Sequence, residues 1–312
     1  MKRFKLFLIF ALVFGLIGVN GIAFAKEYRF VIVPKVVHPW FDLVVEGARA
    51  QAKLLEEQTG DTIIIDYRAP SRGEVVLQNN ILEQAAVTRP DGIAVDLLDE
   101  AGNKVVLESI VNMGIPVVIF DSESPEGMNL TKIGNDFAEQ AQIASERLVE
   151  LLGGKGKVAI MQGVPTAPNH RIRYEAHKAV FDKYPGIELV AEGIDNDDIQ
   201  TAQEQAAAII AAHPDIDGFV ACDAAGPIGI GLAVKEAGRA GDIQVVGLDN
   251  LNQLIELIRE GVVDSSSSTK PQMQGAYSVL MLWQRALGMD TPKEIDTGIE
   301  IITKENLEEL GY

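Results

Sequence analysis

Cysteine is almost absent from the 312-residue sequence, which contains only Cys222. An intrachain disulfide is therefore impossible, and the stability of the chain must come from packing. Positive charge is also scarce, because 27 lysines and arginines face 45 aspartates and glutamates, for a formal net charge of −18. Such an acidic surface repels nucleic acid and anionic lipid, so neither is expected as a partner. Beyond residue 25, no apolar stretch is long enough to cross a membrane.

Glycine is missing at the point where a nucleotide-binding βα turn would carry it. The first expected strand ends at Val33 and runs into Pro34–Phe41, which contains Trp40 and Phe41. Backbone N–H groups approach a pyrophosphate only where side chains are absent. Two aromatic rings at this strand end offer flat apolar faces instead, which favours a neutral, ring-shaped ligand such as a sugar. The histidines lack the close pairing with acids or cysteines that zinc sites show, so no metal and no cofactor is expected.

Residues 1–25 have the pattern of a secretory signal peptide. Lysine and arginine lie within Met1–Lys5, an apolar stretch begins at Leu6, and Ala23-Phe24-Ala25 matches a signal peptidase site. We expect cleavage after Ala25 and a periplasmic mature chain. Because no cysteine follows the cleavage site, a lipid anchor is not expected. The alternative is an uncleaved membrane anchor, since the apolar stretch is just long enough to span a bilayer.

From Lys26 onward, short β-branched runs alternate with helical patterns, which is typical of a parallel sheet covered by helices. The first series predicts strands at Phe30–Val33, Thr62–Tyr67, Gly92–Asp96 and Pro116–Phe120, with helices at Phe41–Gln58, Glu74–Thr88 and Ala101–Met113. The second predicts strands at Lys157–Met161, Ile187–Ala191, Gly218–Ala221 and Gln244–Gly247, with helices at His170–Tyr184, Thr201–His213, Pro227–Gly238 and Leu251–Glu260. The serine run before Pro271 is interpreted as a strand, followed by a helix to Leu287 and a last strand at Ile299–Ile302. The predicted fold class is α/β, with two similar doubly wound parallel-sheet lobes.

Polar and aromatic residues recur just after the predicted strands. In open α/β sheets, ligands bind outside the carboxyl ends of the strands. The candidate ligand-binding residues are Lys35, His38, Trp40, Phe41, Asp121, Ser122, Asn169, Arg171, Asn196, Asp223, Asp249 and Thr269. Carboxylates, amides and a guanidinium bind hydroxyls well, and aromatic rings stack on the C–H faces of a sugar. Each aspartate has an alternative role, because an Asp after a strand often caps the next helix.

The chain resembles the type I periplasmic sugar-binding proteins, typified by the ribose-binding members. The resemblance rests on Val37–Phe41 for the family's Asn-Pro-aromatic-aromatic segment, on Pro116–Asp121 and on Val245–Asp249. It implies two lobes joined by a three-strand hinge near Ile133–Asn135, Leu248–Thr269 and Gly298. The N-terminal lobe would comprise residues 26–133 and 270–298, and the C-terminal lobe 134–269 and 299–312. The implied function is capture of a small carbohydrate by a monomer that delivers it to the membrane permease of an ABC importer.

The same resemblance assigns roles to individual residues. The stacking aromatics fall on Trp40 and Phe41, the hydroxyl-binding acids on Asp121 and Asp249, and the arginine on Arg171. The sequence departs from the ribose pattern in four places, where His38, Ser122, Asn196 and Thr269 replace an Asn, an Arg, an aromatic residue and a Gln. Val33-Pro34-Lys35 and Asp121-Ser122 resemble the branch that includes autoinducer-2 receptors and rhamnose binders, in which the lysine reaches the ligand. The extra acid, Asp223, makes an amino sugar or a polyol a further possibility.

Three other functions compete with transport. A periplasmic receptor for a sugar-like signal, feeding chemotaxis or a sensor kinase, would have the same two lobes. An enzyme is not expected, because no nucleophile, base and acid occur at a usable spacing, and Gly153–Lys157 and Gly226–Gly231 lack the glycine order of nucleotide motifs. A repressor of the lactose-repressor type would need a DNA-binding helix-turn-helix where this chain has its signal peptide.

Overall fold

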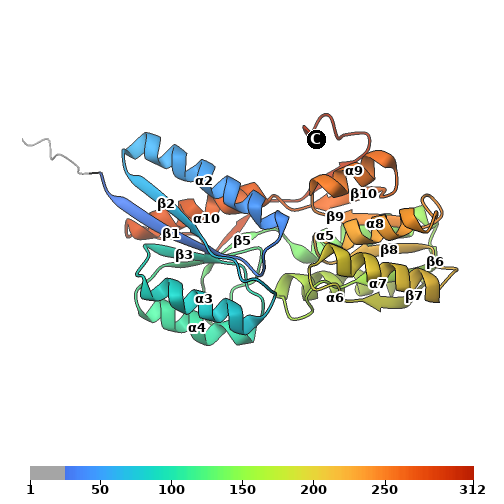
Figure 1. The fold of residues 1–312 in the computed structure, drawn as a ribbon, viewed down its shortest axis with the longest axis horizontal. Coiled ribbons are helices and arrows are strands. Elements are labelled where there is room, and N and C mark those ends of the chain that lie inside the picture. The colour runs from blue at the N-terminus through green and yellow to red at the C-terminus, as the bar shows by residue number, and fades with distance from the viewer. Residues whose placement is uncertain (1–24) are drawn as a thin grey trace, which may run out of the picture.

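The computed structural model describes residues 25–312 as two α/β lobes (Figure 1). The predicted signal peptide, apart from Ala25, lies outside the described residues. Each lobe is built on one six-stranded sheet. Across the described part of the chain, no helix combines the length and the apolar character needed to span a membrane.

The N-terminal lobe contains a fully parallel sheet with the strand order β11-β5-β4-β3-β1-β2. Its strands are β1 (Glu27–Val33), β2 (Thr62–Tyr67), β3 (Gly92–Val95), β4 (Val117–Phe120), β5 (Thr131–Gly134) and β11 (Glu294–Asp296). Helices α2 (Pro39–Thr59) and α10 (Pro271–Ala286) cover one face, and α3 (Val75–Val87) and α4 (Glu100–Asn112) cover the other. Successive residues of β1 face opposite sides, so Ile32 packs with α2 while Val33 packs with α3 and α4.

Helices α2 and α10 approach each other closely through two glycines. A Cβ added at Gly47 would lie 1.9 Å from the Gln272 carbonyl oxygen, and one at Gly275 would lie 1.9 Å from the Val44 carbonyl oxygen. Only glycine permits such backbone contact. This packing fixes α10, although far along the chain, beside the helix that begins with the aromatic residues Trp40 and Phe41.

The C-terminal lobe has the strand order β12-β10-β9-β8-β6-β7, in which only β12 is antiparallel. Its strands are β6 (Lys155–Met161), β7 (Gly186–Gly193), β8 (Gly218–Ala221), β9 (Gln244–Leu248), β10 (Ser265–Ser268) and β12 (Glu300–Thr303). Helices α5 (Phe137–Leu151) and α6 (Pro168–Phe181) pack on one face, and α7 (Ile199–Ala212) and α8 (Gly226–Glu236) on the other. Helix α9 (Asn252–Glu260) packs beside α8.

The four-serine segment is a fully buried strand, β10, as predicted. A buried hydroxyl destabilises the fold unless it is hydrogen-bonded. Ser266 Oγ donates to the Asp249 carbonyl at 2.6 Å, Ser267 Oγ donates to the Gln140 carbonyl at 3.1 Å, and Ser268 Oγ donates to the Thr269 carbonyl at 2.7 Å. The serines thereby join β10 to Gln140, Asp249 and Thr269 near the lobe junction.

The chain passes three times between the lobes. The crossings lie between β5 and α5, between β10 and α10, and between β11 and β12. The predicted α/β class with two doubly wound parallel lobes is confirmed. The sequence prediction omitted β5, α5 and β11. Two of these are strands of three or four residues, whereas α5 carries a recognisable apolar face at Phe137, Ala141, Ala144 and Leu148.

Candidate functional site

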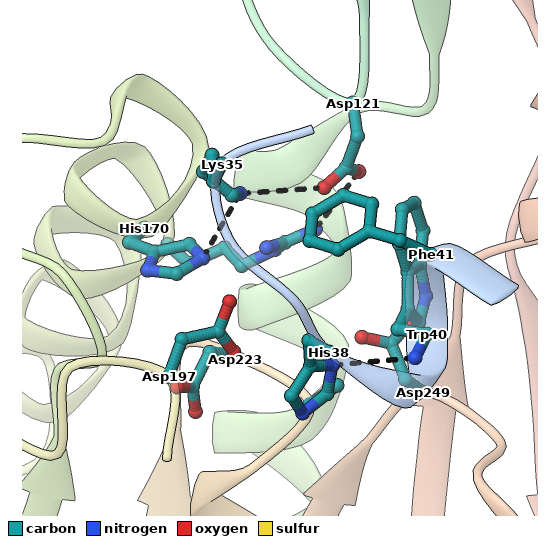
Figure 2. A pocket seen from close by; sticks show the side chains of 11 residues that line it. Lys35, His38, Trp40, Phe41, Asp121, His170, Asp197, Asp223 and Asp249 are labelled. Atoms are coloured by element: carbon teal, nitrogen blue, oxygen red, sulfur yellow. Dashed lines mark hydrogen bonds and ion pairs between the residues drawn. The ribbon is translucent and has the colours of Figure 1, made fainter. Parts of the chain in front are cut away.

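A polar pocket lies between the two lobes, at the carboxyl ends of their strands (Figure 2). Its walls combine aromatic, acidic and basic side chains from both lobes. The lining residues are Lys35, His38, Trp40, Phe41, Asp121, His170, Arg173, Asp197, Asp223, Ala224 and Asp249.

Two of the pocket acids occupy matching places in the two lobes. Asp121 directly follows β4 and has φ 44°, while Asp249 directly follows β9 and has φ 72°. The left-handed region is costly for a residue with a side chain, although Asp and Asn enter it most easily. Such strained backbone persists at sites where it has a function. The two aspartates are thus turned into the pocket by the backbone itself.

Lys35 joins the lobes at one side of the pocket. Its ammonium, 2% exposed, lies 3.1 Å from Asp96 Oδ2 and 3.8 Å from Asp121 Oδ2, and donates to Asn169 Oδ1 at 3.2 Å. Burial lowers the pKa of Lys35, but the attraction of Asp96, Asp121 and Asp197 outweighs it and raises that pKa above its ordinary value. Lys35 is therefore a cation in the site at neutral pH.

His170 presents a hydrogen-bond donor next to Lys35. The backbone N–H of Val164 donates to His170 Nδ1 at 2.9 Å, so the proton of the neutral ring is on Nε2. Burial and the neighbouring cations Lys35 and Arg173 hold the pKa of His170 well below its usual value, so the ring is neutral. His170 Nε2 and Lys35 Nζ, 3.3 Å apart, are both donors and can converge on one ligand oxygen.

Arg173 provides the guanidinium of the pocket. Its side chain is 2% exposed. Nε donates to Gln140 Oε1 at 2.9 Å, and Nη1 donates to the Cys222 carbonyl at 3.1 Å. Nη2 lies 3.7 Å from Asp121 Oδ1, and neither atom has a hydrogen-bond partner. A ligand hydroxyl between them could accept from Arg173 and donate to Asp121.

The aromatic wall is held by hydrogen bonds at the start of α2. His38 is the N-cap residue, and its Nδ1 accepts from the Trp40 backbone N–H at 3.3 Å. The indole Nε1 donates to Thr269 Oγ1 at 3.1 Å, and the Thr269 hydroxyl donates to Asp249 Oδ1. The rings of Trp40 and Phe41 meet edge to face, with centroids 5.2 Å apart.

Two further acids, Asp197 and Asp223, line the side of the pocket contributed by the loops after β7 and β8, and Asp195 is buried behind them. Asp195 Oδ1 accepts from the Asp197 backbone N–H, and Asp223 Oδ1 accepts from the Gly226 backbone N–H. Burial and mutual repulsion raise the pKa of Asp223 well above its ordinary value, and burial raises that of Asp195 to about 6. The Asp195–Asp223 pair therefore retains a proton in weakly acidic solution. Among residues 25–312, no group of three or more histidines, cysteines or acids could hold a metal ion.

The structure brings most predicted site residues together but displaces three of them. Arg171 points outward from α6 with its side chain 58% exposed, 3.8 Å from Glu100, so its predicted place in the pocket is wrong. Asn196 is exposed on a left-handed loop, and its neighbour Asp197 lines the pocket instead. Ser122 is buried beside the pocket but does not line it, and its hydroxyl has no partner.

Asn169 and Thr269 lie one layer behind the wall. Asn169 accepts from Lys35 and donates to Asp121 Oδ2 at 2.7 Å, whereas Thr269 links Trp40 to Asp249. Both residues position the groups that line the pocket.

Comparison with known proteins assigns the chain to a family. The model of the periplasmic binding protein domain matches residues 28–290. The chain belongs to the periplasmic binding protein family. Members of this family bind solutes and are not enzymes, which agrees with the expectation from the sequence. The resemblance to periplasmic sugar-binding proteins is confirmed at the level of the family.

Several relatives of this periplasmic binding protein are similar to it in sequence or structure over most of its length. It is 25% identical over 289 residues to the D-ribose/D-allose-binding protein of Pseudomonas aeruginosa, covering 89% of each chain. A solute-binding protein of Burkholderia graminis in complex with D-arabinose superposes with a TM-score of 0.85 at 25% identity, covering 92% of this chain and 98% of that one. GanP, a glucose-galactose binding protein from Geobacillus stearothermophilus, gives a TM-score of 0.82 at 28% identity, covering 90% and 99%.

Proposed function

We propose that this protein binds a small carbohydrate between its lobes and delivers it to the permease of an ABC importer. The observation that carries the proposal is a set of four buried polar atoms that line the pocket without partners: the donors His38 Nε2 and Arg173 Nη2 and the acceptors Asp121 Oδ1 and Asp223 Oδ2. Buried polar groups need hydrogen bonds. A sugar hydroxyl both donates and accepts, so a ring of hydroxyls matches this alternation of donors and acceptors.

The aromatic wall and the relatives support the same ligand class. Trp40 and Phe41 provide apolar surface beside the hydrogen-bonding groups, which suits the C–H face of a sugar ring. The relatives named for D-ribose, D-allose, D-arabinose and D-apiose cover most of this chain. The lysine in the pocket, Lys35, supports the resemblance to the autoinducer-2 and rhamnose branch, although it does not select one sugar.

We infer that ligand binding closes the lobes about the three crossings. The moving bodies would be residues 26–133 with 270–298 and residues 134–269 with 299–312. Contacts across the cleft support this motion, because Leu98 packs on Val164 and Ala167, and Thr166 Oγ1 donates to the Leu98 carbonyl at 3.2 Å. A ligand that touches both lobes binds the closed state better and so shifts the population toward it. We also propose that the mature protein is exported to the periplasm and acts there as a monomer.

A thermal-shift screen of neutral pentoses, hexoses, deoxy sugars and polyols, together with amino sugars, tests this function. A ligand at about 100 times its Kd stabilises the native state by about 2.7 kcal/mol, which raises the Tm by roughly 5–10 °C for a chain of this size. The mature chain, beginning at Lys26, is compared with Asp121→Asn, which removes one of the unpartnered acceptors. We expect a sugar to raise the Tm of the unchanged mature chain, and to raise the Tm of Asp121→Asn by less. The proposal fails if no carbohydrate shifts the Tm, or if the variant responds equally.

A further inference from the structure

The pocket distributes its charges unequally between two sides. On one side, Asp96 and Asp121 lie within 4 Å of Lys35, and Asp121 also lies 3.7 Å from Arg173. On the other side, the carboxylates of Asp195, Asp197 and Asp223 have no Lys, Arg or His nitrogen within 4 Å among residues 25–312. Figure 2 shows Asp197 and Asp223 set apart from Lys35 and Asp121. Acids outnumber cations, and the excess is on the C-terminal lobe.

The carboxylates on this acidic side keep unused acceptor atoms. Asp223 is 1% exposed and lines the pocket, and its Oδ2 has no partner. Oδ2 of Asp195, which is fully buried and does not line the pocket, also has no partner. Even if Asp195 and Asp223 share one proton, the charge of Asp197 still acts on both of them and raises the pKa of each. A buried carboxylate without a cation is costly, and a neutral hydroxyl brings a hydrogen bond but no charge.

We propose that the ligand of this pocket carries a protonated amine that binds against Asp223 and Asp197, so that it is an amino sugar or an aminated polyol. This inference rests on the proposed function and names the chemical class within it. An ammonium group has three donors and a positive charge, so it can satisfy two or three carboxylate oxygens at once.

The rest of the pocket is compatible with a cation at this place. His170, on α6 of the same lobe as Asp223, is neutral and adds no repulsion. The charges of Lys35 and Arg173 are balanced by Asp96 and Asp121, while Arg173 Nη2 keeps no hydrogen-bond partner. The donors of Lys35, His170 and Arg173 would bind oxygens at the opposite end of the ligand. The pocket therefore selects a ligand that is donor-rich at one end and acceptor-rich at the other.

Calorimetry with matched sugars tests the amine. The probes are D-glucosamine, D-galactosamine and D-mannosamine, each with its parent hexose and its N-acetyl derivative, together with an aminodeoxyinositol and myo-inositol. We expect one amine to bind at least about tenfold more tightly than its hydroxyl and acetyl counterparts, since one charge-assisted contact is worth about that factor. Asp223→Asn should raise the Kd of the amine by about tenfold or more and the Kd of its parent sugar by less than about threefold.

Asp290→Asn is the matched control, because it removes the same charge from a fully exposed site. It should leave every affinity unchanged. If Asp223→Asn does not fold, as judged by circular dichroism, Asp197→Asn takes its place. The amine proposal is overturned if a neutral sugar of the panel binds more tightly than every amine, or if the substitution weakens amine and parent equally. If a neutral sugar binds most tightly, the proposed sugar binding still holds. If neither the amines nor the neutral sugars bind, both proposals are overturned.

Discussion

Replacing Arg173 by lysine is the substitution that most sharply separates the roles of the two arginines on α6. Arg173 is buried in the pocket, and Arg171, two residues earlier, is exposed. Lysine keeps the positive charge but loses the planar fork that bonds Gln140 and Cys222 while leaving Nη2 for the ligand. The same change at Arg171 is the matched control.

The magnitudes follow from the bonds that are lost. One hydrogen bond from a charged donor to a ligand hydroxyl is worth about 1.5–3 kcal/mol, so Arg173→Lys should raise the Kd by about tenfold to a hundredfold. Loss of the bonds to Gln140 and the Cys222 carbonyl should also lower the free energy of unfolding by about 2–4 kcal/mol. Arg171→Lys should change either quantity by less than about 0.5 kcal/mol, because its contact with Glu100 is exposed and long.

Isothermal titration with a carbohydrate found in the screen gives the affinities, and urea unfolding gives the stabilities. Both variants are measured at equal protein concentration with the unchanged mature chain as reference. An unchanged Kd for Arg173→Lys, together with a loss of binding for Arg171→Lys, would refute the assignment of the pocket guanidinium.

Three further outcomes are expected. Thr269→Val removes the hydroxyl between Asp249 and the indole, and should lower the free energy of unfolding by about 1–3 kcal/mol in urea titrations. Gly163→Ala places a Cβ 2.5 Å from His170 Nδ1 at φ 71°, so it should weaken ligand binding in calorimetry. Burial lowers the pKa of His177 to about 4, so the unfolded chain binds more protons between pH 6.5 and 4 and stability falls as the pH drops. His177→Gln should reduce that fall by roughly 2–3 kcal/mol, measured by urea unfolding at both pH values.

The alternation of strands and helices was predictable because it depends on local patterns. Buried parallel strands are short β-branched runs, and helix stop signals such as Gly114 stand in the sequence itself. The order of strands within each sheet and the three crossings depend on contacts between distant segments, such as α2 with α10. The resemblance to a family implied the three crossings, whereas the strand order was not predicted, because no local pattern contains it.

The errors at the site have two different physical causes. The buried positions His170, Arg173 and His177 of α6 recur every three to four residues, so helical periodicity would have favoured Arg173 over Arg171. Asp197 lines the pocket in place of the predicted Asn196 because the loop after β7 has left-handed backbone, which no sequence pattern predicts.

The contact of Asp96 with Lys35 was missed for another reason. Asp96 ends the predicted strand Gly92–Asp96, which lies beside β1 in the sheet, where Val33 pairs with Val95. Its carboxylate therefore meets Lys35 only because the two strands are neighbours, which the sequence alone does not reveal.

The sharpest test of the proposed site is a crystal structure of the mature protein with the tightest-binding carbohydrate of the screen. We expect the ligand to lie between the lobes against Trp40 and Phe41. Arg173 Nη2 should donate to a ligand oxygen, whereas Asp121 Oδ1 and Asp223 Oδ2 should accept from ligand O–H or N–H groups. A ligand bound elsewhere, for example in the groove beside Leu251 and Tyr312, with these atoms still unpartnered, would contradict the proposed site.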